Sequence, residues 1–86
     1  MSNTLLKEEW VGLDIEILSS RNPSNQGIKG KLLDETFHTL TIFHNGKVKR
    51  LMKRNVIFKI KKNDHWYKIN GSTIEFRPED RVKKIK

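Results

Sequence analysis

The feature that most constrains this sequence is a succession of short segments in which apolar and polar residues alternate, separated by signals for tight turns. The clearest is residues 13–17, where Leu and Ile alternate with Asp and Glu. A period of two is typical of a strand with one buried and one exposed face. Asn45-Gly46 and Asn70-Gly71 are strong hairpin signals, because both residue types tolerate positive φ. A further turn is expected at Lys62-Asn63-Asp64. The pattern predicts an antiparallel sheet of short strands.

Further strands are expected at about residues 28–36, 39–44, 47–61 and 65–69, with a return strand beginning near Ile74 and Phe76. A brief kink is expected at Arg54 and Asn55, within the longest of these segments. Gly30 lies inside a strand segment, where a glycine is typical of a bulge or a sharp bend. The pattern predicts a mainly β fold, either a small barrel or a strongly bent antiparallel sheet, because closure removes exposed edges.

Short helices are expected at both ends of the chain. Residues 1–11 are predicted to be helical, because Leu6 and Trp10 share a face at i, i+4 spacing. Residues 78–86 are predicted to form a basic tail that begins as a helix at Pro78, with acids first and bases last to match the helix dipole. The 86 residues make a single domain, 1–86, with a modest core.

The composition excludes several classes of protein. The chain has no cysteine, which excludes a disulfide framework and a cysteine-bound zinc site. No apolar run approaches the roughly 20 residues that a membrane span requires, so no membrane association is expected. The first residues lack the basic and apolar regions of a secretory signal, so a cytoplasmic location is expected.

Charge gives the strongest functional signal. Eighteen Lys and Arg against ten Asp and Glu give a net charge of +8. Residues 1–20 hold one Lys and four acids, a net charge of −3, so residues 21–86 carry +11. Such a one-sided excess favours a polyanion ligand over a membrane surface or simple solubility. The stretch from Lys47 to Lys68 holds nine Lys or Arg and one acid, many of them expected on the outer face of strands, where they meet phosphates.

The aromatic residues are expected mainly in the core, because so small a core needs most of them for packing. Recognition of a nucleic acid by its backbone and shape is therefore favoured over base stacking. The residues concerned are Trp10, Phe37, Phe43, Phe58, Trp66, Tyr67 and Phe76.

No catalytic constellation is found, and no metal or cofactor is expected on this chain. His38 and His44 could share a strand face, but a zinc ion would need further ligands, and polar surface residues are the preferred interpretation. Asp34 and Glu35 are adjacent, so on a strand they point to opposite faces, which is poor geometry for a shared metal. The chain also lacks a Gly-rich phosphate loop.

The order of several motifs resembles protein component 1 of archaeal ribonuclease P, from about Trp10 to Arg81. These motifs are WVGLDIEILSSRNPSNQGIKGKLLDETFHTLTI, then NGKVKRLMKRNVIFKI, ING and FRPEDR. The combination of Gly27, Gly30, Glu35 and Thr36 is fairly specific, and Arg77 to Arg81 is the most telling piece. Phe37-His38 departs from the polar pair common in that family.

The resemblance implies a small Sm-like fold and a subunit of the ribonucleoprotein that removes the 5′ leader from precursor tRNA. Catalysis would belong to the RNA subunit and its magnesium ions, and this protein would support the folding and stability of that RNA. Precursor tRNA would be an indirect partner. A zinc-ribbon protein subunit, among other holoenzyme proteins, would be a direct one.

Two sets of candidate site residues follow from the charge pattern, the loops and the resemblance. The residues expected to contact RNA are Arg21, Lys29, Lys53, Arg54, Arg77, Arg81, Lys83 and Lys84. The residues expected to contact the protein partner, chosen from the acidic N-terminal segment and an adjoining strand, are Leu5, Leu6, Trp10, Ile28 and Leu33.

Two other interpretations compete. The first is another small basic β-barrel, either a ribosomal protein or a chromatin-associated protein; a DNA-bending protein would need exposed apolar wedges. The second is an autonomous nuclease, against which the missing acidic cluster argues.

Overall fold

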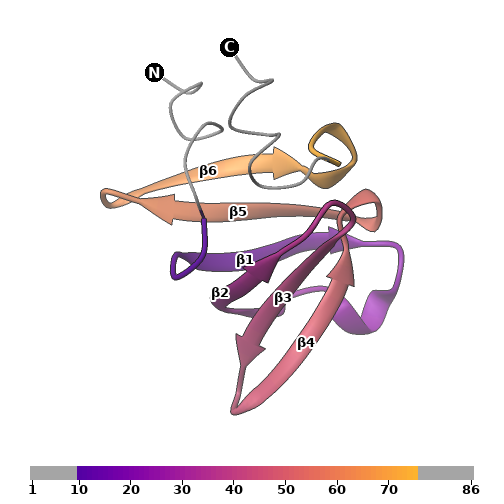
Figure 1. The fold of residues 1–86 in the computed structure, drawn as a ribbon, viewed down its shortest axis with the longest axis horizontal. Coiled ribbons are helices and arrows are strands. Elements are labelled where there is room, and N and C mark those ends of the chain that lie inside the picture. The colour runs from indigo at the N-terminus through magenta and orange to yellow at the C-terminus, as the bar shows by residue number, and fades with distance from the viewer. Residues whose placement is uncertain (1–9, 76–86) are drawn as a thin grey trace.

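A computed structural model describes residues 10–75 of the chain (Figure 1). All the strands belong to one antiparallel sheet in the order β4-β3-β2-β1-β5-β6. The strands are β1 (Asp14–Ser20), β2 (Lys29–Glu35), β3 (Thr39–His44), β4 (Lys47–Met52), β5 (Val56–Lys62) and β6 (His65–Asn70). Three short 3₁₀ turns join or follow them, η1 (Pro23–Asn25), η2 (Lys53–Asn55) and η3 (Gly71–Thr73).

The sheet is strongly bent, as the sequence predicts, because β2 changes partner along its length. Its first residues pair with β1, Gly30 opposite Ile15, and its later residues pair with β3. Gly30 allows this change: a Cβ atom there would lie 1.8 Å from the carbonyl oxygen of Phe43. Within residues 10–75 the sheet stays open, with β4 and β6 as its edges, so the bent sheet is observed rather than a closed barrel.

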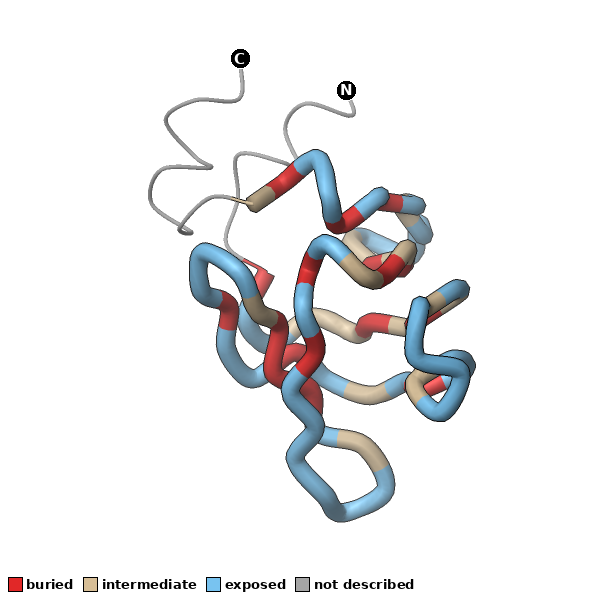
Figure 2. Tube along the Cα trace, turned by 90° about the vertical axis from the view of Figure 1, so that its right-hand side faces the viewer, coloured by how far each residue is buried: buried red, intermediate tan, exposed pale blue. Residues whose placement is uncertain are grey.

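The core lies inside the bend and is built from alternate residues of the strands. Buried positions alternate with exposed or half-buried ones along the strands (Figure 2). Trp10 is fully buried and meets Phe58 edge to face, with ring centroids 5.9 Å apart. The other buried apolar residues are Ile15, Ile17, Ile28, Leu32, Leu40, Ile42, Leu51, Val56, Ile60, Ile69 and Ile74.

The turn signals had mixed outcomes. Asn45 (φ 50°) and Gly46 (φ 76°) connect β3 to β4, so this hairpin is confirmed. The expected turn after Lys62 is also confirmed, with Asn63 (φ 53°) and Asp64 (φ 65°) between β5 and β6. The kink expected at Arg54 and Asn55 is η2.

The hairpin predicted at Asn70-Gly71 is not observed, so this prediction is wrong. Asn70 instead caps η3, its side-chain oxygen accepting a hydrogen bond from the Ser72 backbone N–H at 3.1 Å. Gly71 is needed for a close approach, because a Cβ atom there would lie 1.9 Å from the Lys53 carbonyl oxygen. No return strand begins at Ile74 in the part of the chain that the structure describes. The terminal helices expected in residues 1–11 and 78–86 lie outside it, apart from Trp10 and Val11, which precede β1.

Candidate nucleic-acid interface

The strand register places two rows of polar side chains on the outer face of β2, β1, β5 and β6. Residues directly opposite one another in an antiparallel pair share a face, so each row can be followed from strand to strand. The first row is Lys31, Asp14, Lys61 and Trp66. The second row is Lys29, Glu16, Lys59 and Lys68. We call these eight residues the basic face.

The basic face is cationic even after its internal ion pairs are considered. Lys31 donates to the Asp14 carboxylate at 2.9 Å, and Lys59 lies 3.5 Å from Glu16. This hydrogen bond with Lys31 is the main cause that lowers the pKa of Asp14 below its ordinary value of 3.8, so the carboxylate stays ionised at neutral pH. Five lysines against two acids leave an excess of three positive charges. The face therefore suits an anionic ligand.

Trp66 is the one aromatic residue among these eight, and beyond Lys31 the first row continues to Phe43 of β3. Trp66 is 44% exposed, and the Lys59 ammonium lies 4.7 Å from the centroid of its ring. The Lys61 ammonium lies 6.0 Å from the same centroid. Such positions allow cation–π attraction, which holds both the ring and the lysines on the surface.

A polar cleft continues the basic face at the end of β1 and β6. Ser19, Ile57 and Asn70 form a third row that leads from the lysines to this cleft. The cleft has a volume of about 430 Å³ and brings Arg21 and Arg54 together. The Arg21 backbone N–H donates to the Asn55 carbonyl at 2.9 Å, which ties the end of β1 to η2. Guanidinium groups beside exposed amides and hydroxyls make a good phosphate-binding surface.

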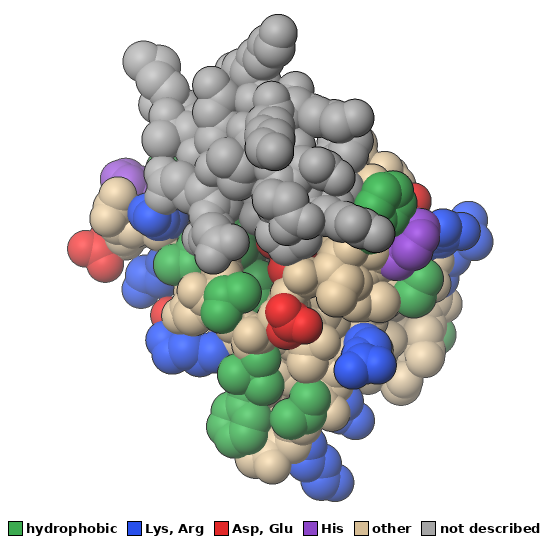
Figure 3. All heavy atoms as spheres, viewed as in Figure 1, with side chains coloured by type: hydrophobic (Ala, Val, Ile, Leu, Met, Phe, Trp, Pro, Cys, Tyr) green, Lys and Arg blue, Asp and Glu red, His purple; other side chains and the backbone are tan. Residues whose placement is uncertain are grey.

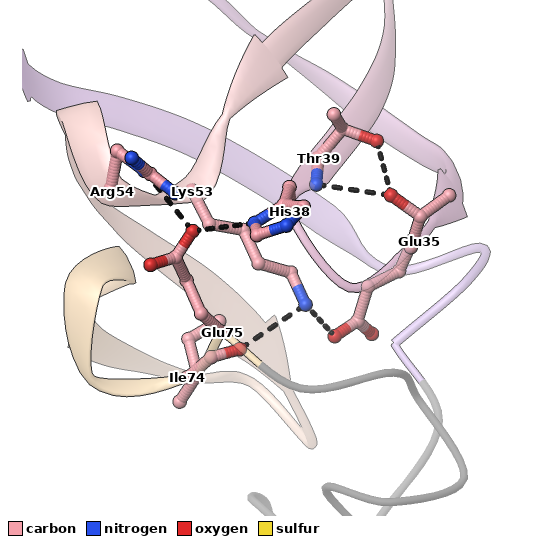
Figure 4. Close-up of polar contacts among 8 residues, drawn as sticks. Glu35, His38, Thr39, Lys53, Arg54, Ile74 and Glu75 are labelled. Atoms are coloured by element: carbon pink, nitrogen blue, oxygen red, sulfur yellow. Dashed lines mark hydrogen bonds and ion pairs between the residues drawn. The ribbon is translucent and has the colours of Figure 1, made fainter.

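Glu75 positions Arg54 at the edge of this cleft. Its Oε2 atom accepts a hydrogen bond from Arg54 Nε at 3.2 Å and lies 2.9 Å from His38 Nδ1 (Figure 4). The hydrogen bond with His38 first, and then that with Arg54, lower the pKa of Glu75 below its ordinary value of 4.5. His38 thus joins an acid at the surface, whereas His44 contacts the Lys29 backbone through its Nδ1 atom, so they occupy separate sites.

Lys53 was expected to contact RNA, and the structure contradicts this. Its side chain is fully buried and donates to Glu35 Oε2 at 2.9 Å and to the Ile74 carbonyl at 3.2 Å (Figure 4). Glu35 is equally buried, with a side chain 1% exposed. The 3₁₀ turn η2 aims Lys53 inward and leaves Arg54 outside. This pair explains why an acid and a base occupy interior positions of so small a core.

The other predicted RNA-binding residues fall into two groups. Lys29, Arg21 and Arg54 are exposed, the first on the basic face and the other two at the cleft. Arg77, Arg81, Lys83 and Lys84 lie outside the described residues.

Among the predicted partner-binding residues, Trp10 and Ile28 are wrong as direct contacts. They are 0% and 4% exposed, because both side chains fill the core beside β1. Leu33 is 44% exposed, next to the register shift in β2, and its role stays a prediction. Leu5 and Leu6 lie outside the described residues.

The sequence predicted that bases between Lys47 and Lys68 lie on outer strand faces, and Lys59, Lys61 and Lys68 do so, although none of them was named as a single site residue. Lys31 and Trp66 were missed as site residues. The signal was present, since a turn at Asn63 and Asp64 sets Lys61 opposite Trp66.

The expectation that the aromatic residues lie mainly in the core holds for half of the described ones, Trp10, Phe58 and Tyr67. Phe37, Phe43 and Trp66 are 40%, 45% and 44% exposed. Figure 3 shows that hydrophobic side chains do reach the surface of the molecule.

Within residues 10–75 no group of three or more His, Asp or Glu side chains is placed to hold a metal ion. Among the described residues, no helix has the length and apolarity to cross a membrane.

Comparison with known proteins gives a consistent result. The family model for ribonuclease P/MRP, subunit p29, matches residues 3–84. Ribonuclease P protein component 1 of Archaeoglobus fulgidus is 41% identical over 85 residues, which cover 93% of this chain and 78% of that protein. The protein of the same name from Methanococcus aeolicus is 40% identical over 82 residues, covering 93% and 85%.

A solved structure is similar along most of the described fold. It is that of Mth11, described as a homologue of the human RNase P protein Rpp29. The TM-score is 0.65 at 31% sequence identity, and the match covers 87% of this chain and 99% of that chain.

Proposed function

This chain belongs to the ribonuclease P/MRP subunit p29 family and is a protein subunit of ribonuclease P, and we propose that it binds the RNA of that enzyme through the basic face and the adjoining cleft. The observation that carries this proposal is the pair of lysine rows on four neighbouring strands, continuous with Arg21 and Arg54. Lysine-rich antiparallel ladders space positive charges along a surface, where each phosphate contact releases condensed counterions.

In the proposed division of labour, this protein supports the RNA and the RNA cleaves the substrate. As the resemblance to archaeal ribonuclease P protein component 1 implies, we assign cleavage of the precursor-tRNA 5′ leader to the RNA subunit with its magnesium ions, in the cytoplasm. The protein neutralises phosphates that folding brings together, and so stabilises the folded RNA.

A zinc-ribbon protein subunit remains part of this proposal. Residues 1–20 carry a net charge of −3, so they suit a basic protein better than RNA. Deleting residues 1–9 should weaken pairing with that subunit more than it weakens RNA binding. If RNA binding were the property lost, the segment would belong to the RNA interface instead.

The test of RNA binding uses the full chain, ribonuclease P RNA and duplex DNA as competitor. Affinity for the RNA should exceed that for DNA and should fall steeply with salt, by about 0.7–0.9 log units per log unit of salt for each phosphate contacted. Adding the protein to the reconstituted enzyme should speed 5′ processing at limiting Mg²⁺. A flat salt response, or a preference for duplex DNA, would favour another small basic β protein.

A further inference from the structure

We propose that Trp66 and the pocket beside it form a binding site for one unpaired nucleobase of the RNA, with Lys29 and Lys61 placed to contact its flanking phosphates. This inference rests on the proposed function and deepens it. It adds direct recognition of a base to an interface that charge alone would make insensitive to base pairing.

The first observation that supports a base-binding site is the exposed position of Trp66. A large aromatic side chain on the solvent side of an edge strand loses the free energy it would gain from burial in the core. Its neighbours on the sheet are polar: Lys61 lies opposite it, and Lys68 lies two residues along β6 on the same face. Trp66 is therefore an isolated apolar ring within a cationic surface, not the edge of the core.

The second observation is a pocket beside the Trp66 ring. It has a volume of about 260 Å³ and is lined by Asp14, Ile15, Lys29, Gly30 and Trp66. Sites that enclose whole small molecules usually measure about 300–1,000 Å³, so this pocket suits a single flat ring. Lys59, whose ammonium also contacts the Trp66 ring, is not among the residues that line this pocket.

The polar groups at the pocket match the edges of a base and its phosphates. Asp14 accepts from Lys31 through Oδ1, and a carboxylate has capacity for further hydrogen bonds, such as those from an exocyclic amino group. Lys29 lines the pocket, and Lys61 lies directly opposite Trp66 on β5. Stacking on an aromatic ring combined with lysines for the backbone is the general way proteins hold unpaired nucleotides.

An exposed Trp can also anchor a protein partner. The basic face argues against a basic partner such as the proposed zinc-ribbon subunit, because the lysines around Trp66 would repel it. The excess of three positive charges on the basic face and the exposed Trp66 ring together make the surface complementary to RNA.

The experiment compares full-length wild type with Trp66→Ala, Trp66→Phe and Phe37→Ala. Phe37 is the matched control, because it is an aromatic residue of similar exposure, 40% against 44% for Trp66, and lies in the connection between β2 and β3, outside the rows of the basic face. The probes are a short single-stranded oligoribonucleotide and a blunt RNA duplex of the same sequence. Trp66→Ala should weaken single-strand binding about 5–150-fold, the range measured for losing one stacked base. Duplex binding should change little, and Trp66→Phe should recover most of the affinity.

Salt dependence separates stacking from charge. Trp66→Ala should leave the slope of log affinity against log salt unchanged, whereas Lys29→Ala should lower it by about 0.7 for a single strand. Fluorescence gives an independent readout: of the two tryptophans, Trp10 is fully buried, so quenching by the single strand should vanish in Trp66→Phe.

The outcomes distinguish the two proposals. If wild type binds neither probe nor ribonuclease P RNA, the proposed function fails. If wild type binds but Trp66→Ala binds both probes as well as wild type, or loses duplex and single strand equally, only the base-binding site is refuted. Loss confined to pairing with another protein subunit would also refute it and assign Trp66 to a protein interface.

Discussion

The buried ion pair between Glu35 and Lys53 supports the sharpest prediction about stability. Replacing Lys53 with Met removes the ammonium that lies 2.9 Å from the Glu35 carboxylate, at a site where both side chains are at most 1% exposed. Breaking a buried pair by removing one partner costs about 3–5 kcal/mol, a large part of the roughly 5–15 kcal/mol that holds a domain folded. The melting temperature should fall by about 12 °C at the least, given about 4–8 °C per kcal/mol in a domain of this size.

The same reasoning predicts that removing both charges is better tolerated than removing one. Glu35→Leu combined with Lys53→Met eliminates both desolvation costs, leaving the Ile74 carbonyl short of one hydrogen bond, which costs about 1–3 kcal/mol. Urea unfolding of wild type, both single variants and the double variant completes a double-mutant cycle, in which the coupling energy should reach about 2 kcal/mol or more.

An exposed pair of the same length provides the control. Lys31 and Asp14 are also 2.9 Å apart, but their side chains are 60% and 46% exposed. Lys31→Met should therefore cost no more than about 1 kcal/mol. Additive losses in the Glu35–Lys53 cycle, or equal costs for Lys53→Met and Lys31→Met, would refute the argument from burial.

Three further predictions concern the cleft, the bend and pH. Arg54→Ala should lower the salt slope of RNA binding by about 0.7–0.9, measured by titration at several salt concentrations. Gly30→Ala should lower the free energy of unfolding in urea by about 1–3 kcal/mol or more, because the added Cβ would lie 1.8 Å from the Phe43 carbonyl oxygen. Glu75 has a folded pKa below its ordinary 4.5, so its stabilising contribution is present above that pH and is lost as pH falls through the lowered pKa. Melting curves across this range should therefore show a shallower acid loss for Glu75→Gln than for wild type.

Each of these predictions has a control and a contrary outcome. Lys53→Met should keep the wild-type salt slope, and an unchanged slope in Arg54→Ala would place the RNA elsewhere. In Gly46→Ala the added Cβ would meet no atom within 4 Å, and the φ of +76° is the only source of strain. Gly46→Ala should therefore destabilise the fold less than Gly30→Ala. Equal acid sensitivity in Glu75→Gln and wild type would show that the contacts of Glu75 with His38 and Arg54 do not stabilise the fold.

Local signals in the sequence were sufficient for the six strands of residues 10–75 and for two of the three expected turns, although they also predicted a return strand at Ile74 that is not observed there. The period of two in residues 13–17 predicts which side chains of β1 are buried, because pleating alone sends neighbours to opposite faces. The turn after Lys62 goes further, since a two-residue connection sets the register of β5 against β6 and hence places Lys61 opposite Trp66. The sheet, its polar outer face and its charge could therefore be predicted from the sequence.

The candidate site depended on contacts between residues far apart in the chain. Arg21 and Arg54 share a cleft only because β1 and β5 pair and η2 packs beside the end of β1. In the sequence, nothing distinguishes Lys53 from the neighbouring lysines and arginines. It is buried because η2 turns its side chain inward, where it pairs with Glu35. Asn70-Gly71 carried a hairpin signal, but close packing against the Lys53 carbonyl favoured a 3₁₀ turn. Periodicity and turn chemistry act over a few residues, whereas burial and charge pairing depend on which distant strand lies opposite, and only the tertiary structure decides that.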